Sequence, residues 1–548
     1  MQKYLVKIII FYVIYFATLL KYNAQTFPWA TSATGSGTDE GIAICNDVNG
    51  NVFVTGQFTS PVITFGTYTL SNSGSSTVFL TKYNANGNVL WAKKAVSTSD
   101  DYGNSVTADA LGNVFVTGYF ASPTISFGSY TLTNSGNYDI FIVKYDAGGN
   151  VLWAKSAGGA GNDNGYSAKT DGAGNIYLTG SFGSSIIVFG SYTLTNSGVL
   201  DAYLVKYDTN GNVLWAKNPM GSGADESWSV CPDANGNVYF TGDYISATMV
   251  FGTYTITNLG ACSLFLAKYD GNGNALWVKN AEVSNFDKSN WVTVDAAGNA
   301  LISGDFSIPS LIFGSYTLTN NGNSDAFITK YNTNGNIVWA KAAGGLGYDK
   351  GYSLSTDANN IYSTGCFTNN IIFGSYTLTA PANAPDPMFI VTYDYSGNVK
   401  CASSLISGGD DQNGISADNM GYAYFTSDFK MSPCVIGATT LVPTGGENVF
   451  VAKYLCDNIT DIKNNDPNLT TMIFPNPNAG NFKIEFNGET DKEEMEFVLI
   501  NSIGQKVYEQ KITNQKNNIN TVNMEKGLYH YIILKSRRQI NKGKLVIE

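Results

Sequence analysis

The chain repeats itself at a nearly constant interval, and this repeat limits the folds that it can adopt. The stretch YDTNGNVLWAK at 207–217 recurs with small changes at 83–93, 145–155, 269–279 and 331–341. Five Phe-Gly pairs mark the same interval, because their glycines are evenly spaced along the chain: Gly66, Gly128, Gly190, Gly252 and Gly314. Each unit contains short stretches of alternating apolar and polar residues, separated by Asx-x-x-Gly-Asn turns, which is the pattern of strands joined by tight hairpins. A long period built only of strands predicts an all-β fold of the β-propeller type.

Four strands are expected in each repeat, and counting them gives the number of blades. In the second repeat they lie at 104–110, 113–118, 139–146 and 150–155. The first three occur seven times, but the fourth follows only six of them, at Trp91, Trp153, Trp215, Trp277, Trp339 and the degenerate Cys401. A spare copy, FPWATSA at 27–33, precedes the repeats and places Trp29 one full interval before Trp91. We therefore expect a seven-bladed β-propeller over 25–456 in which the N-terminal strand completes the last blade and removes an exposed sheet edge.

The tryptophan of the fourth strand recurs in nearly every repeat. A large apolar side chain at this position is expected to fill the space between neighbouring sheets, because such residues are usually buried. The alternative is a ring of tryptophans that stack on sugars.

The two ends of the chain differ from the repeat. Residues 1–24 combine Lys3 and Lys7 with an apolar run at 8–20 and a small residue at Ala24, which is the pattern of a signal peptide. The run is shorter than the roughly 20 residues of a spanning helix, so no transmembrane segment is expected. After the repeats, the polar stretch 457–471 is expected to be a linker, and the strand patterns of 472–548 predict a small C-terminal β-sandwich.

The C-terminal region also contains a specific series of motifs: FPNPNAGNFKIEF at 474–486, VLINSIGQKVYEQKI at 498–512 and GLYHYIILK at 527–535. In this order they resemble the type A C-terminal sorting domain of proteins exported by the type IX secretion system of Bacteroidetes. The repeats resemble the SBBP β-propeller repeat family through their Asp…Gly-Asn-apolar-apolar-x-Thr-Gly core and their Phe-Gly-x-Tyr-Thr-Leu segment. The resemblances imply export through the periplasm to the cell surface or the medium, with the secretion machinery as partner of 472–548. The propeller family implies a fold but no fixed activity.

The composition argues against several kinds of chemistry. The formal net charge is −11 and the only arginines are Arg537 and Arg538, so the chain lacks the basic stripe that nucleic-acid binding needs. His530 is the only histidine, which leaves the propeller without a histidine as general base or metal ligand. The seven cysteines have no zinc-ligand spacing, and the DTNGN turns lack the full calcium-loop pattern. We therefore expect no metal site and no cofactor, and expect most cysteines to be small buried side chains.

Seven aspartates recur at the interval of the repeat, each just before the first strand of a unit: Asp39, Asp101, Asp163, Asp225, Asp287, Asp349 and Asp411. One interpretation is a cap, in which each carboxylate accepts backbone N–H bonds of its own loop. The other is a ring of carboxylates that collects cations or a basic ligand at a channel mouth. Trp228 and Trp291 lie in or beside the same loops, where exposed aromatic side chains favour recognition. The seven aspartates and these two tryptophans are the candidate ligand-binding residues.

The expected function is non-catalytic binding or adhesion outside the cell, with a glycan or protein ligand on the face that these loops form. A catalytic site normally breaks a repeat at one or two blades, and the repeats stay close to one another, so we expect no enzyme. Two alternatives stay open: a glycosidase or lyase that uses carboxylates of the propeller face, and a structural surface component.

Overall fold

The structure is a computed structural model that describes residues 24–281, 287–380, 386–405, 414–430, 434–457, 470–476, 480–487, 495–501, 506–512, 516–522, 524, 526–535 and 538–547. The predicted signal peptide before Ala24, most of the predicted linker and Asp411 lie outside these residues. One compact unit spans Gln25–Cys456, and a second one contains the described residues from 470 onward. All regular elements in the described ranges are β-strands, which confirms the all-β prediction. No helix in these ranges is long and apolar enough to cross a membrane.

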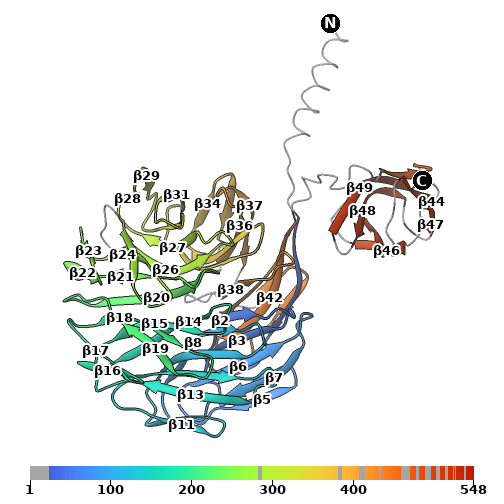
Figure 1. Ribbon diagram of the computed structural model, residues 1–548. Coiled ribbons are helices and arrows are strands. Elements are labelled where there is room, and N and C mark those ends of the chain that lie inside the picture. The colour runs from blue at the N-terminus through green and yellow to red at the C-terminus, as the bar shows by residue number, and fades with distance from the viewer. Residues whose placement is uncertain are drawn as a thin grey trace. The chain divides into compact units, whose positions relative to one another are not determined.

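The described residues of the unit Gln25–Cys456 form seven four-stranded antiparallel sheets, numbered 1 to 7 here in chain order (Figure 1). The first strands are β2 (Asp39–Asn46), β8 (Asp101–Ala108), β14 (Asp163–Thr170), β20 (Asp225–Pro232), β26 (Asp287–Val294), β32 (Asp349–Thr356) and β38 (Gly414–Ala417). The second strands are β3 (Val52–Phe58), β9 (Val114–Phe120), β15 (Ile176–Phe182), β21 (Val238–Tyr244), β27 (Ala300–Phe306), β33 (Ile361–Phe367) and β39 (Tyr422–Phe429). The third strands are β6 (Thr77–Tyr83), β12 (Asp139–Tyr145), β18 (Asp201–Tyr207), β24 (Ser263–Tyr269), β30 (Asp325–Tyr331), β36 (Met388–Tyr393) and β42 (Asn448–Asp457). The fourth strands are β7 (Val89–Lys94), β13 (Val151–Ala157), β19 (Val213–Lys217), β25 (Ala275–Asn280), β31 (Ile337–Ala343), β37 (Val399–Leu405) and, in sheet 7, β1 (Ala24–Ser32).

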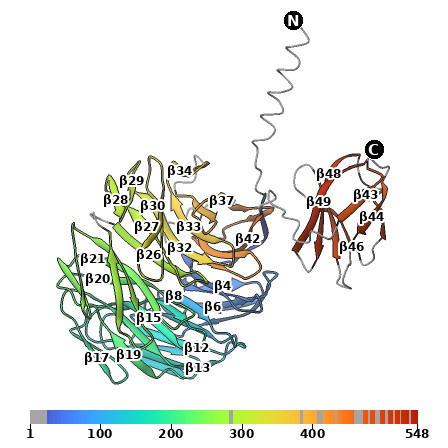
Figure 2. The same ribbon diagram turned by 45° about the horizontal axis from the view of Figure 1, so that its top comes forward.

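The first strands contact one another in a closed order. β2 contacts β8, β8 contacts β14, and the series continues through β20, β26 and β32 to β38, which contacts β2 again. The first strands therefore lie at the centre and the fourth strands at the rim, with the sheets following one another around the centre (Figure 2). This arrangement of repeated four-stranded sheets is that of a β-propeller.

The N-terminal strand completes sheet 7, as the repeat spacing predicts. β1 pairs with β42, and the N–H of Ala33 donates to the carbonyl of Val449 at 2.9 Å. The ring of Phe27 in β1 packs against Tyr454, with 5.4 Å between the ring centroids. Because β1 covers the free edge of β42, sheet 7 has no unpaired third strand.

Two-stranded hairpins occupy the connection between the second and third strands of each sheet. They are β4 (Val62–Phe65) with β5 (Tyr68–Ser71), β10 (Thr124–Phe127) with β11 (Tyr130–Thr133), β16 (Ile186–Phe189) with β17 (Tyr192–Thr195), β22 (Thr248–Phe251) with β23 (Tyr254–Thr257), β28 (Ser310–Phe313) with β29 (Tyr316–Thr319), β34 (Asn370–Phe373) with β35 (Tyr376–Thr379), and β40 (Cys434–Ile436) with β41 (Thr439–Leu441). Gly66, at the turn of the first hairpin, has a φ of 58°, which explains the recurring Phe-Gly pair. The hydroxyl of Tyr68 donates to the carbonyl of Leu90 in β7 at 2.6 Å, so the hairpin packs on the fourth strand of its own sheet.

The repeated tryptophans lie at the junctions between sheets. Trp153 Nε1 of sheet 2 donates to the carbonyl of Thr209 in sheet 3 at 3.2 Å, and its side chain is buried. In each such contact the tryptophan donates to a residue of the neighbouring sheet. This acceptor is the second residue after the tyrosine at the end of the third strand of that sheet: Ala85, Ala147, Thr209, Gly271, Thr333 and Tyr395. The tryptophans therefore fill the space between neighbouring sheets, one of the two interpretations of the sequence.

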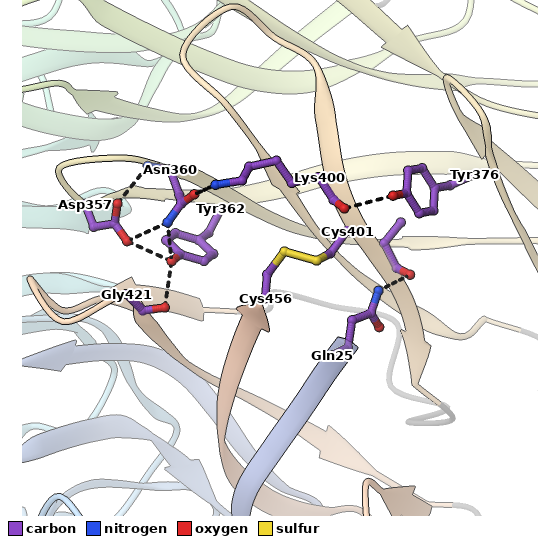
Figure 3. The surroundings of a disulfide bond; sticks show 10 residues. Gln25, Asp357, Asn360, Tyr362, Tyr376, Lys400, Cys401, Gly421 and Cys456 are labelled. Carbon is purple, nitrogen blue, oxygen red and sulfur yellow. Dashed lines mark hydrogen bonds between the residues drawn. A yellow bond between two sulfur atoms is a disulfide. The ribbon is translucent and has the colours of Figure 1, made fainter. Parts of the chain in front are cut away.

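A disulfide takes the place of this contact between sheets 6 and 7. Cys401 stands at the tryptophan position of β37, and Cys456 is the second residue after Tyr454, which is the acceptor position; the two sulfur atoms are bonded (Figure 3). The side-chain amide of Gln25, next to the start of β1, donates to the carbonyl of Ala402 at 2.7 Å. The end of β42 and the start of β1, both in sheet 7, are thus attached to neighbouring residues of β37 in sheet 6. The other described cysteines, Cys45, Cys231, Cys262, Cys366 and Cys434, are not part of a disulfide.

The second unit contains two antiparallel sheets. One consists of β43 (Thr470–Phe474), β44 (Asn481–Asn487) and β47 (Lys516–Asn520); the other consists of β46 (Lys506–Ile512), β45 (Met495–Ile500), β48 (Gly527–Lys535) and β49 (Arg538–Ile547). Buried side chains of both sheets form one cluster, in which Phe482 of the first packs with Phe497 of the second at 5.7 Å between ring centroids. The first strand begins at Thr470, just before the boundary expected from the sequence.

Candidate functional site

The first strands of sheets 1 to 6 each contain a β-bulge at the third position after the recurring aspartate. In sheet 3, for example, Gly165 pairs with Gly180 and Ser167 with Thr179, so Tyr166 between them has no partner on β15. The bulged residues are Ile42, Asn104, Tyr166, Trp228, Asn290 and Tyr352. A bulge changes the direction of a side chain relative to its strand. Here all six bulged residues line a single cavity of about 370 Å³.

A glycine on the second strand of sheets 1 to 6, which follows threonine except in sheet 5, accommodates the bulge. A Cβ atom added at Gly118 of β9 would collide with the carbonyl oxygen of Tyr102, two residues before the bulged Asn104 of sheet 2. The same collision occurs at the equivalent glycines: Gly56, Gly180, Gly242, Gly304 and Gly365. In sheet 7 the position is Ser427, and the described part of β38 pairs with β39 in regular register. The recurring Thr-Gly pair therefore has a structural cause, which is the close approach of the bulged backbone.

The cavity lies at the centre of the first strands. Trp291 of β26 lines it, and the ammonium of Lys169 in β14 is 5.7 Å from the centre of the same indole ring. β14 and β26 belong to sheets 3 and 5, which are not neighbours, so this contact crosses the space that the first strands enclose. Trp291 therefore forms part of the wall of the cavity and also contacts Lys169.

One side of the cavity is aromatic. The rings of Tyr166 and Trp228 are stacked, with 4.4 Å between their centroids and 30° between their planes. Tyr119 packs edge-on against Tyr166 at 6.4 Å, and Tyr102 lies 4.8 Å from Tyr119. This group of rings, from sheets 2 to 4, forms a continuous aromatic surface that ends in the cavity.

Two carboxylates, the buried Asp243 and the half-buried Glu226, hold the aromatic side in place. Trp228 Nε1 donates a hydrogen bond to Asp243, and the hydroxyl of Tyr166 donates to Glu226 at 3.2 Å. Burial raises the pKa of both carboxyl groups, and the hydrogen bonds that they accept oppose this shift. The carboxyl groups therefore position Trp228 and Tyr166.

The part of the cavity lining that comes from sheets 5 and 6 is charged. Lys288 of β26 is exposed, Lys350 of β32 is half-buried, and Asp305 belongs to β27, which pairs with β26; all three line the cavity. Burial raises the pKa of Asp305 to about 6, against a hydrogen bond from Asn290 and the charges of Lys350 and Lys288. Within the described ranges, neither lysine forms an ion pair with a carboxylate.

The predicted site residues divide into two groups. Trp228 and Trp291 line the cavity, whereas none of the five aspartates with described side chains does so: Asp39, Asp101, Asp163, Asp225 and Asp349. These five are fully buried, and Asp39 accepts hydrogen bonds from the N–H of Ser60 at 3.1 Å and from its hydroxyl at 2.6 Å. Ser122, Ser184 and Ser246 make the equivalent contacts with the next three aspartates, so most donors come from the loop after the second strand. The side chains of Asp287 and Asp411 lie outside the described residues.

Sequence reasoning missed several residues of the cavity, namely Asn104, Asn290, Tyr352, Lys288, Lys350 and Asp305. The repeat itself identifies three of them, Asn104, Asn290 and Tyr352, because the third residue after each aspartate differs from repeat to repeat while its neighbours are mostly glycine, serine or alanine. Across the described part of the chain, no three His, Cys, Asp or Glu side chains are grouped so as to hold a metal ion.

Two family models match the chain. Residues 472–548 match the secretion system C-terminal sorting domain, and residues 91–119 match the beta-propeller repeat. The chain thus contains SBBP-type propeller sequence and a type IX sorting domain, as the motifs indicated. The sorting domain marks the protein for export to the outer surface or the medium.

Two curated proteins match part of the chain. An uncharacterized WD repeat-containing protein of Acanthamoeba polyphaga mimivirus is 25% identical over 421 residues, which is 62% of this chain and 30% of that protein. The regulatory protein FlaEY of Caulobacter vibrioides is 24% identical over 270 residues, which is 46% of this chain and 28% of that protein. The chain therefore spans less than a third of the length of these relatives.

A solved structure with similarity to the chain is PorZ of Porphyromonas gingivalis, described as an essential surface component of the type IX secretion system. It is 7% identical, with a TM-score of 0.20 and coverage of 95% of this chain and 100% of that one.

Proposed function

We propose that this exported protein is a non-catalytic binding protein, in which a seven-bladed β-propeller presents the central cavity to a glycan or protein ligand. The observation that supports this most directly is the convergence of six bulged residues, from six consecutive sheets, on one cavity. Its volume of about 370 Å³ is within the roughly 300–1,000 Å³ of small-molecule sites. Aromatic faces beside a few amide and charged groups are the usual lining of such sites.

Two features support the domain assignment within this proposal. The closed order of contacts among the first strands, together with the pairing of β1 with β42, supports a ring of seven blades. The single buried cluster between two sheets supports a β-sandwich for residues 472–548. This β-sandwich is the part that engages the type IX secretion machinery.

The experiment is a binding array of glycans and extracellular proteins, probed with the full chain and with Trp228→Ala and Trp291→Ala. Both variants should lose the array signal, because each removes an aromatic wall of the cavity. Tyr348→Ala is the matched control, since Tyr348 is 56% exposed beside β32 and does not line the cavity. A wild-type signal that survives in both tryptophan variants would move the binding site elsewhere, and a chain without any array signal would favour a structural surface component.

A second candidate function rests on Asp305. A carboxyl group with a raised pKa in a cavity suits a general acid, as in glycosidases. Under this hypothesis the protein cleaves a polysaccharide, and Asp305→Asn abolishes cleavage while the Lys217→Gln control, an exposed change on β19, does not. The measurement is product release from a polysaccharide panel, and a wild-type protein that binds a glycan without releasing product would exclude this candidate for that glycan.

A further inference from the structure

We infer that the cavity binds a saccharide that carries a carboxylate group, with the sugar ring against the aromatic side and the carboxylate toward Lys288 and Lys350. This inference rests on the proposed binding function and names the class of its ligand.

The charges around the cavity favour an anion. The two lysines enter it from neighbouring strands, β26 and β32, and no described carboxylate forms an ion pair with either of them. The ammonium of Lys169 is 5.7 Å from the centre of the Trp291 ring, which lines the cavity. Three carboxyl groups also lie beside these lysines, those of Asp305, Asp243 and Glu226, and burial raises the pKa of each. An anionic group within reach of the two lysine ammoniums is attracted to them.

The carboxylates near the cavity are engaged by the protein itself. Glu226 accepts hydrogen bonds from the hydroxyls of Tyr166 and Ser181 at 3.2 and 3.3 Å, and Asp243 accepts one from Trp228. Asp305 accepts a hydrogen bond from Asn290 at 3.3 Å. The charged hydrogen-bond donors in the cavity lining are therefore the ammonium groups of Lys288 and Lys350.

The aromatic side and the amide groups favour a sugar over a simple anion. The stacked pair of Tyr166 and Trp228 presents a flat apolar surface, and the C–H face of a pyranose ring packs on such a surface. Asn104 and Asn290 also line the cavity; their amide nitrogens donate to the carbonyls of Gly165 and Gly351, and their amide oxygens can accept hydrogen bonds from sugar hydroxyls. A small inorganic anion uses neither feature, whereas a uronic acid uses the aromatic surface, the amides and the lysines together.

The test compares acidic trisaccharides with their neutral methyl esters, because the two differ in charge and share the ring and its hydroxyls. The full chain is titrated by calorimetry with the trimers of galacturonate and mannuronate and with the ester of each. The acid should bind about tenfold or more tightly than its ester, and added salt should narrow the difference. The double variant Lys288→Gln, Lys350→Gln should lose about tenfold in affinity for the acid and keep its affinity for the ester. Trp228→Ala should weaken both, and Lys217→Gln should change neither.

The same titrations have a pH signature. The charged and titratable groups that face Asp305 are Lys288, Lys350, Asp243 and Cys366. With its pKa raised to about 6, Asp305 loses most of its negative charge between pH 7.5 and 5.5, while a uronate, with a pKa near 4, stays ionised. Affinity for the acid should therefore rise several-fold on this change of pH, and Asp305→Asn should bind more tightly at pH 7.5 with a flatter profile.

Each outcome bears on one of the two proposals. Equal affinities for acid and ester at low salt would overturn the inference and leave the proposed binding function intact. Wild-type chain that binds no acidic trimer would also overturn it, while the glycan and protein array decides the binding function separately. Loss of acid binding in the lysine variant with a melting temperature equal to that of the wild type would support it.

Discussion

The disulfide between Cys401 and Cys456 should contribute measurably to the stability of the propeller. It joins β37 of sheet 6 to the end of β42 in sheet 7, and the loop that it closes contains most of sheet 7. A cross-link over 55 residues lowers the entropy of the unfolded chain by an amount worth about 4 kcal/mol in the loop-closure model. Measured effects are usually about 2–4 kcal/mol, so Cys401→Ala with Cys456→Ala should lower the free energy of unfolding by that amount.

Tryptophan fluorescence in a denaturant series is the assay. All eight tryptophans lie between Trp29 and Trp339, so the signal reports on the propeller and not on the C-terminal unit. Wild-type protein in reductant should unfold at the same lower denaturant concentration as the double-alanine variant, and reductant should not shift that variant further. An unchanged midpoint in both cases would show that the junction is held by packing alone.

The repeat also suggests how to recover part of the loss. Cys401→Trp with Cys456→Ala recreates the tryptophan–carbonyl contact of the other junctions, for which Trp339 and Tyr395 are the model at 3.1 Å. This variant should regain about 1–2 kcal/mol relative to the double-alanine variant. A stability below that of the double-alanine variant would mean that the junction differs in shape from the others.

Four further predictions concern other parts of the chain. Deleting 25–36 removes β1 and should cost several kcal/mol in thermal unfolding, through a lost hydrogen-bond ladder and lost packing; an unchanged melting temperature would mean that β1 does not close the ring. Asp163→Asn with Asp225→Asn should lower the free energy of unfolding by about 0.5–2 kcal/mol per cap, and calcium should change the melting temperature of the variant and of the wild type only slightly. A large calcium-dependent rise in the melting temperature of the wild type that the variant abolishes would make the aspartates a cation site. Burial raises the pKa of Asp349 to about 7 in the folded state, so between about pH 4 and 7 the folded chain binds a proton that the unfolded chain releases, and the free energy of unfolding should fall as pH rises. In Asp349→Asn the free energy of unfolding should depend less steeply on pH, and an identical dependence would exclude Asp349 as its source. Removing 472–548 should leave a folded propeller in the periplasm, as judged by cell fractionation, and normal amounts of the truncated protein at the surface would contradict this role of the sorting domain.

Much of the fold follows from the sequence because the repeat is nearly exact. The position of Trp29, one repeat interval before Trp91, is enough to assign β1 to the last sheet. Pairing within each sheet also follows, because consecutive strands joined by Asx-x-x-Gly-Asn turns have only one antiparallel arrangement. The hydrogen bonds of Asp47 to the N–H groups of Asn49 and Asn51, both at 2.9 Å, show the physical reason for these turns.

The disulfide could not be predicted in the same way. Composition offers seven cysteines and many pairings, and nothing local joins Cys401 to Cys456. The pairing becomes clear only when each fourth-strand tryptophan is known to contact the residue 56 positions later, because the disulfide spans 55 residues at the equivalent place. A contact between sheets is a property of the packed ring, so it is absent from any pattern within a single repeat.

The cavity is the part of the protein in which the repeat is least strictly kept, and the bulges explain why. A bulged residue has no partner on the second strand, so a change at this position leaves strand pairing intact. The residue after the bulge is more constrained: the hydroxyl of Ser229 accepts a hydrogen bond from the N–H of Val292 in the next sheet at 3.1 Å, and Ser105, Ser167 and Ser353 make equivalent bonds. Trp291 occupies this constrained position in sheet 5, where a tryptophan cannot make the serine contact, and it lines the cavity instead. Departures from a repeated pattern that bring no structural gain are expected at functional sites. Here the freely variable position and the exceptional tryptophan fall on the same cavity, which is the strongest reason to look for the ligand there.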